Sequence, residues 1–192
     1  MSTRRPFGAT VWADLASFAE LKKRPFPSLT GLIDVLLMPG VIAVLIFRVA
    51  SALHRLRLRP LSRLLYIFNM ALFSVDLAPN AEIGAGFALP HPVGVAVAPQ
   101  TRIGERARLF QGVSVGGGAT EDPTRDGFPT IGNDCWLFAG AKVLGPVTIG
   151  DGAMVAANAL VVRSVPPRAV VLGNPARVVR FREPSAPADA VE

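Results

Sequence analysis

One aliphatic residue recurs every six positions through the middle of the chain. The series runs Leu77, Ile83, Leu89, Val95, Ile103, Leu109, Val115, Ile131, Leu137, Val143, Ile149, Val155 and Val161. Two steps are irregular: eight residues separate Val95 from Ile103, and sixteen separate Val115 from Ile131. A period of six matches neither an α-helix nor one strand, and it is typical of a parallel β-helix whose coils take about 18 residues each. The alternative, strands of a sandwich, would need hairpin dipeptides between them.

Two further positions of each hexapeptide follow the same rhythm. A small or apolar residue usually stands four residues after the aliphatic, and we expect it to point inward as well. Cys135 occupies such a position, which favours a buried core thiol over a nucleophile. Glycine often follows the aliphatic directly, and we expect it to accept corner backbone angles that a Cβ would make costly. Such glycines are Gly84, Gly104, Gly116, Gly132 and Gly150.

The residues before the repeat have a helical pattern. Apolar spacing predicts one helix over residues 10–24 and a second that Thr30 would cap. A third is predicted over 41–58, and Pro60 would begin a fourth that runs to about Phe73.

The chain therefore divides into a helical region, a repeat and a tail. We predict a mainly β protein, with an α-helical region at residues 1–74 and a β-helix domain at 75–182. The repeat loses its phase at 116–130, which predicts a loop that projects from one corner. Residues 183–192 have the composition of a disordered tail.

Charge is concentrated at the N-terminal end. The net charge is +6, and residues 1–63 carry ten Lys/Arg against three acids. The basic residues are not interleaved with aromatics as in a nucleic-acid module, so nucleic acid is not an expected partner. Apolar helices beside arginines at 30–63 suit either packing against partner subunits or peripheral contact with a membrane. A single cysteine and the absence of a signal-peptide pattern favour the cytoplasm, with any membrane contact on its inner face.

Chemistry within the repeat centres on one histidine. His91 follows an inward aliphatic by two residues, so its side chain should emerge near a corner. Asp76 precedes it by fifteen residues, which brings it close in a coil of about 18. A carboxylate on one imidazole nitrogen would leave the other as a general base. The chain's other histidine, His54, lies among arginines and favours an exposed basic face. A zinc site of three histidines is not expected, because the repeat supplies one.

The chain resembles the hexapeptide-repeat acyltransferases, and within them the serine acetyltransferase branch. The resemblance is carried in order by residues 75–84, 91–94, 111–117, 140–145 and 165–177. It implies a left-handed β-helix, a homotrimer or a pair of trimers, and acetyl-CoA as donor without a metal. It also implies that His91 is the general base and Asp76 its partner, in a site between subunits covered by the loop.

The same resemblance indicates where acetyl-CoA would lie. In the implied reaction, His91 takes a proton from an acceptor hydroxyl that attacks the thioester, and backbone N–H groups stabilise the oxyanion. The candidate residues for binding acetyl-CoA are Gly116, Gly117, Ala139, Lys142, Arg163 and Arg177.

The acceptor is left open by two departures from the serine-specific pattern. Pro90 replaces an aspartate before the histidine, and Gly127-Phe128 replaces an Arg-His pair in the loop. An amino acid needs a cation for its carboxylate and an anion for its ammonium, and Arg125 is one substitute. L-serine is therefore the acceptor implied by resemblance, and a sugar hydroxyl is the alternative. A non-catalytic β-helix scaffold is the alternative of another class.

Overall fold

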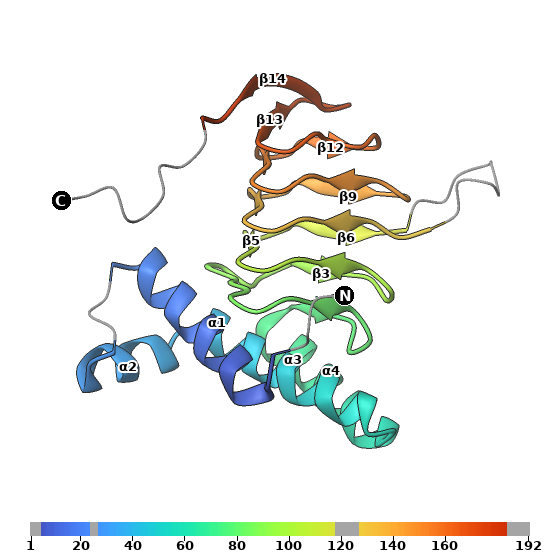
Figure 1. Ribbon diagram of the computed structural model, residues 1–192. Coiled ribbons are helices and arrows are strands. Elements are labelled where there is room, and N and C mark those ends of the chain that lie inside the picture. Colours follow the sequence, from blue (N-terminus) through green and yellow to red (C-terminus); the bar gives the residue numbers. More distant parts are fainter. Residues whose placement is uncertain (1–4, 24–26, 118–126, 184–192) are drawn as a thin grey trace.

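The computed structural model describes residues 5–23, 27–117 and 127–183 (Figure 1). The helices are α1 (Phe7–Leu21), α2 (Leu29–Leu36), α3 (Pro39–Arg55) and α4 (Arg59–Phe73). The four predicted helices are confirmed, and Pro60 lies in the first turn of α4 as expected. The bounds differ, because α1 spans 7–21 rather than 10–24, and α3 begins at Pro39 and ends at Arg55 rather than spanning 41–58. Thr30 as a cap is wrong, because Ser28 caps α2 and its hydroxyl accepts a hydrogen bond from Gly31 N at 3.1 Å.

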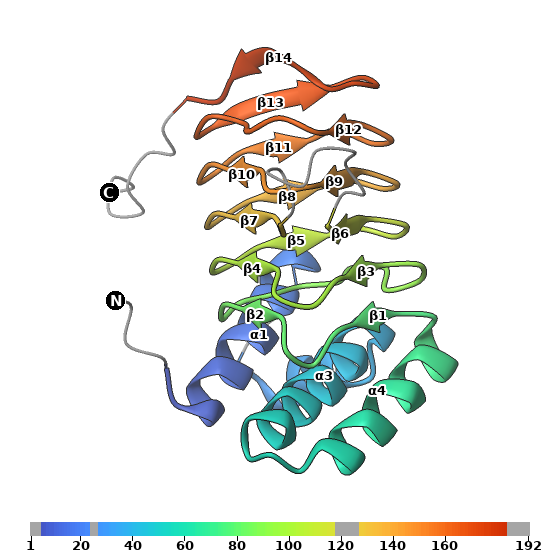
Figure 2. The same ribbon diagram turned by 90° about the vertical axis from the view of Figure 1, so that its right-hand side faces the viewer.

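The repeat forms three sheets that run the length of the β-helix (Figure 2). The first contains β1 (Asp76–Leu77), β3 (Ala96–Val97), β6 (Ser114–Gly116), β9 (Lys142–Leu144) and β12 (Leu160–Val161). The second contains β2 (Glu82–Ile83), β4 (Arg102–Ile103), β7 (Thr130–Ile131) and β10 (Thr148–Ile149). The third contains β5 (Arg108–Leu109), β8 (Trp136–Leu137), β11 (Met154–Val155), β13 (Ala169–Leu172) and β14 (Arg177–Phe181). The pairs are parallel except β13 with β14, so the predicted parallel β-helix is confirmed.

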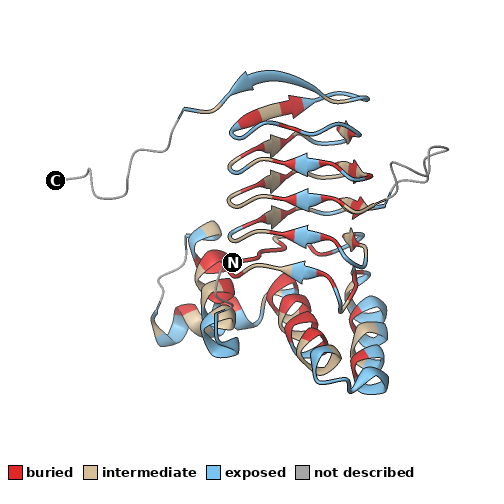
Figure 3. Cartoon of the chain, turned by 45° about the vertical axis from the view of Figure 1, so that its right-hand side comes forward, coloured by how far each residue is buried: buried red, intermediate tan, exposed pale blue. Residues whose placement is uncertain are grey.

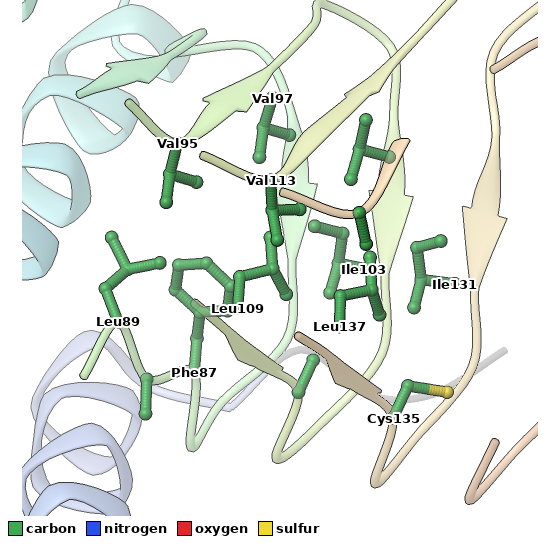
Figure 4. Close-up of a cluster of buried hydrophobic side chains, with 14 of the residues drawn as sticks. Phe87, Leu89, Val95, Val97, Ile103, Leu109, Val113, Ile131, Cys135 and Leu137 are labelled. Carbon is green, nitrogen blue, oxygen red and sulfur yellow. The ribbon is translucent and has the colours of Figure 1, made fainter. Parts of the chain in front are cut away.

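The aliphatic series points into the core of the β-helix (Figures 3 and 4). All of its members are buried except Ile83, which is half-buried where the helices meet the first coil. The sequence, however, puts the eight-residue step in the wrong place, between Val95 and Ile103. Leu77 pairs with Val97 rather than Val95, so Val97 is the in-phase residue and Val95 is a second inward residue of the same corner.

The extra residues of the first coil lie at the corner that contains His91. Asp76 pairs with Ala96, 20 residues on, whereas Ala96 pairs with Ser114, 18 residues on. The offset is still 20 at the Ala88–Arg108 bridge and is 18 at the next pair, Ala96 with Ser114. The repeat therefore makes room for His91 by lengthening its corner by two residues.

The glycines that follow the aliphatics are required for space rather than for backbone angle. Gly84 and Gly104 do not have positive φ, contrary to the expectation from sequence. A Cβ on Gly84 would lie 2.6 Å from the carbonyl carbon of Gly104, and one on Gly104 would lie 2.7 Å from that of Gly132. Neighbouring coils approach too closely at this corner for any side chain.

The helices close one end of the β-helix (Figures 1 and 2). They also carry large apolar side chains that are exposed. The large apolar side chains of α4 that are exposed are Leu61, Leu64, Ile67, Phe68, Met70 and Leu72. No single described helix is long and apolar enough to cross a membrane, although α2 and α3 pass that test together as a pair bent by 76°. Membrane contact through residues 30–63 stays a prediction.

Candidate functional site

The turn that carries His91 lies against the start of the first strand. Gly94 N donates to Ser74 O at 2.8 Å, and Asp76 N donates to Val95 O at 2.8 Å. These bonds bring the histidine corner and Asp76 to the same edge of the first sheet, as the spacing predicted. His91 is exposed and makes no hydrogen bond or ion pair within the described residues. The predicted contact between the two side chains therefore stays a prediction.

Asp76 has a different partner in the chain. Its neighbour Leu77 points into the core, so the Asp76 carboxylate faces outward from β1. The hydroxyl of Tyr66 on α4 donates to Asp76 Oδ1 at 2.7 Å. Burial, together with the Asp76 carboxylate, raises the pKa of Tyr66 to about 12. The phenol therefore stays protonated near neutral pH and serves as a donor.

A cavity of about 460 Å³ opens beside Asp76, between the helices and the outer face of the first sheet. Asp76, Ser114 and Gly116 line its sheet side, and Arg63 and Tyr66 line its helix side. His54 also faces this cavity and is half-buried, so its expected place on an exposed basic face is wrong. This volume suits a small ligand, and its lining combines apolar surface with a few polar groups, as ligand pockets usually do.

Two predicted site residues, Asp76 and Lys142, stand in one outward row of this sheet. The register pairs Asp76 with Ala96, Ala96 with Ser114, and Ser114 with Lys142. Lys142 Nζ donates to Gly112 O at 2.7 Å and to Ser114 Oγ at 3.2 Å. The Lys142 ammonium group therefore lies beside Ser114, two coils from Asp76, and does not extend into solvent.

The corner beside that row is built from glycine turns stacked on one another. Gly112 N donates to Val93 O at 3.0 Å, and Gly140 N donates to Gln111 O at 2.9 Å. Ala139, a predicted acetyl-CoA residue, lies in this stack next to Gly140, and Asn158 N donates to its carbonyl at 2.9 Å. A corner with so few side chains lets an elongated ligand approach the backbone, starting near His91.

The loop residues frame the opposite edge of the sheet. Gly116 ends β6, and Gly117 lies beside the ring of Phe128, whose Cε1 would be 3.5 Å from a Cβ at Gly117. Both ends of the predicted loop therefore meet at this edge. Arg125 lies outside the described residues. Pro90 is half-buried in the His91 corner.

The remaining candidates lie farther along the coils. Arg163 follows β12 and Arg177 begins β14, and both are exposed. Arg177 Nη1 donates to Ala176 O at 3.0 Å. Cys135 is fully buried, which confirms its predicted role in the core. Across the described ranges, no group of three His, Cys, Asp or Glu side chains is placed to hold a metal ion.

Comparison with known proteins connects this geometry to one family. The model of the family described as bacterial transferase hexapeptide (six repeats) matches residues 128–163. The serine acetyltransferase of Mycobacterium tuberculosis is 38% identical over 156 residues, which are 81% of this chain and 67% of the relative. That of Helicobacter pylori is 34% identical over 145 residues, or 76% of this chain and 84% of the relative.

The chain belongs to the serine acetyltransferase family. Solved structures of this family agree. Soybean serine acetyltransferase complexed with serine has a TM-score of 0.78 and 35% identity, over 90% of this chain and 69% of that one. A Brucella abortus serine acetyltransferase in complex with coenzyme A has a TM-score of 0.82 and 26% identity, over 93% of this chain and 70% of that one. The predicted left-handed β-helix is thereby confirmed.

Sequence reasoning missed the helix side of the cavity. Tyr66 and Arg63 precede the repeat, and no six-residue period includes them. Their approach to Asp76 depends on how α4 docks against the first coil, since only Ser74 and Val75 separate the helix from β1. The one available signal was the short distance in sequence between a predicted helix and Asp76.

Proposed function

We propose that this member of the serine acetyltransferase family transfers an acetyl group from acetyl-CoA directly to an acceptor hydroxyl, with His91 as the general base. The observation that carries the proposal is the meeting of the His91 corner with Asp76, which lines a cavity of about 460 Å³. His91 itself is not among the residues that line this cavity. The relative solved with coenzyme A supports acetyl-CoA as the donor. The family supports an O-acetyltransferase rather than a scaffold.

The proposed reaction is a single displacement. His91 accepts the hydroxyl proton while the acceptor oxygen bonds to the thioester carbon. Backbone N–H groups of the site stabilise the oxyanion. The C–S bond then breaks, and the imidazolium gives its proton to the departing thiolate. Asp76 orients the imidazole and balances its positive charge.

The acetyl donor is assigned to the corner of stacked glycine turns that starts near His91. Ala139 contributes backbone, and the charge of Lys142 is held beside the same stack. Arg163 and Arg177 remain candidates for the phosphates farther along the coils. The predicted homotrimer, or pair of trimers, would place a neighbouring subunit against this corner.

Two acceptors compete within the proposal. L-serine is supported by the relatives, among them the soybean enzyme solved with serine. A sugar hydroxyl is supported by Pro90 and by Phe128, whose ring lies beside Gly117 where the family pattern has a charged pair. The Phe128 ring offers apolar contact to an acceptor but no positive charge to bind the carboxylate of serine.

The test is thiol release from acetyl-CoA, measured with L-serine and with a panel of sugars. We expect His91→Ala to lower kcat by about 100-fold or more, because general base catalysis contributes about 10²–10⁴-fold. Arg180→Ala, an exposed change on β14 at the far end of the β-helix, should leave the rate unchanged. Undiminished transfer by His91→Ala would refute the assignment of the base. A fast and selective rate with L-serine would remove the sugar alternative.

A further inference from the structure

Tyr66 lies on the side of α4 that faces β1. Ser62 and Asn69 lie on the same side at helical spacing, and both are buried. Ser62 Oγ donates to Ala50 O at 2.8 Å, and Asn69 Nδ2 donates to Ala43 O at 3.0 Å. These two bonds fix α4 on α3 on either side of Tyr66. The phenol is therefore presented by packed helices and not by a loop.

The surroundings of the phenol favour one role, donation to a carboxylate. The charged and titratable groups that face it are Asp76 from β1, Arg63 from its own helix and His54 across the cavity. The Arg63 guanidinium lies 5.3 Å from the centroid of the Tyr66 ring, within the range of a cation–π contact. The 2.7 Å bond to Asp76 Oδ1 occupies one carboxylate oxygen and leaves the other free of Tyr66.

We propose that Tyr66 is a positioning residue for acetyl transfer: it fixes the Asp76 carboxylate so that Oδ2 can orient the imidazole of His91. The inference rests on the proposed function, because it takes Asp76 as the partner of the base. Groups that hold the partner of a catalytic side chain act by fixing its rotamer. The phenol does so, because its hydrogen bond restrains the Asp76 carboxylate.

A double-mutant cycle tests the role in catalysis. Tyr66→Phe removes one oxygen and keeps the ring that packs under Arg63. A hydrogen bond to a charged group contributes about 1.5–3 kcal/mol, so we expect kcat to fall about tenfold or more while KM for acetyl-CoA is unchanged. In the Asp76→Asn background, the same change should alter kcat less than twofold. Phe68→Leu, at an exposed aromatic on the same helix, is the matched control.

The division of the effect between kcat and KM separates positioning from a general loss of structure. A general loss of structure changes kcat and the KM for acetyl-CoA together, whereas a misplaced carboxylate lowers kcat alone. A raised KM for acetyl-CoA in Tyr66→Phe, or equal losses of kcat in both backgrounds of the cycle, would overturn the inference.

An optical titration tests the hydrogen bond without any substrate. Tyr66 is the only tyrosine in the sequence, so ultraviolet absorption of phenolate reports this residue alone. We expect its pKa to lie near 12 in the unsubstituted chain and to be lower in Asp76→Asn, where burial, the larger cause of the raised pKa, remains. Circular dichroism confirms the fold. Identical titrations in the two proteins would contradict the bond.

The two proposals can fail separately. If His91→Ala and Asp76→Asn lose transfer while Tyr66→Phe is fully active, the proposed function stands and the role of Tyr66 falls. If His91→Ala retains transfer, the proposed function falls, and with it the catalytic role of Tyr66. In that second case the optical titration still decides whether Tyr66 and Asp76 are coupled.

Discussion

At the scale of single residues, the hexapeptide register determines which side chains meet water. Cys135 occupies an inward position and is fully buried, with its Sγ 3.2 Å from Gly150 O. Burial raises the pKa of its thiol from 9.0 to about 11. The register predicts this environment, because the neighbours of Cys135 belong to the same repeat. It does not predict the bond between Tyr66 and Asp76, because Tyr66 lies outside the repeat.

The thiol of Cys135 should make stability depend on pH in the alkaline range. Because its pKa is higher in the folded chain than in the unfolded one, its contribution is complete below about pH 9 and is lost as pH rises toward 11. Two pKa units correspond to roughly 2–3 kcal/mol. Cys135→Ala should therefore show a shallower fall of unfolding free energy between pH 9 and 11 than the unsubstituted chain, by urea titration at each pH. Parallel curves for the two proteins would refute this assignment.

At the scale of elements, neighbouring coils approach each other so closely at one corner that only glycine fits there. The sequence pattern located Gly84 and Gly104 correctly, but the reason is the approach of the next coil and not a left-handed backbone. Sequence spacing carries no information on the distance between coils, so this reason required the structure. The same holds for the His91 corner, because Val95 and Val97 are equally apolar and only strand pairing shows which one is in phase.

Gly104→Ala should destabilise the β-helix. Its Cβ would meet backbone atoms of the next coil, which have little freedom to move, and overpacking of this kind costs about 1–3 kcal/mol. Gly8→Ala is the matched control, since Gly8 lies in α1 and a Cβ there meets nothing within 4 Å. Alanine also favours a helix by up to about 1 kcal/mol over glycine, so the control should be neutral or stabilising in thermal unfolding. Equal effects of the two changes would show that space is not the cause.

At the scale of the whole molecule, the helices are fastened to the open end of the β-helix by a buried ion pair. Arg48 on α3 donates from Nε to Asp14 Oδ2 on α1 at 2.8 Å, and also to the carbonyl oxygens of Ile83 and Gly84, each at 2.6 Å. The Asp14 carboxylate also accepts from Phe87 N at 2.9 Å. Apolar periodicity predicted the helices and the coils separately. Their docking depends on this polar cluster, which brings together residues far apart in sequence and has no periodic signature.

Burying Asp14 and Arg48 removes both charges from water, and this desolvation determines how substitutions of the pair should change stability. Burial raises the pKa of the Asp14 carboxyl above its ordinary value, although Arg48 and the Phe87 amide lower it. Asp14→Asn should destabilise the chain by about 3–5 kcal/mol, because the buried guanidinium loses its counter-charge. The paired change Asp14→Leu with Arg48→Met leaves no buried charge and should cost less than Asp14→Asn alone.

Fluorescence in urea measures this docking directly. The two tryptophans report the two parts of the molecule, since Trp12 lies on α1 and Trp136 on β8. With Trp12→Phe or Trp136→Phe to isolate each signal, we expect coincident transitions in the otherwise unsubstituted chain. In Asp14→Asn, the Trp12 transition should move to lower urea than that of Trp136, because α1 loses its attachment before the coils separate. Coincident transitions that both move would instead mean that the pair stabilises the helices and the β-helix as one cooperative unit.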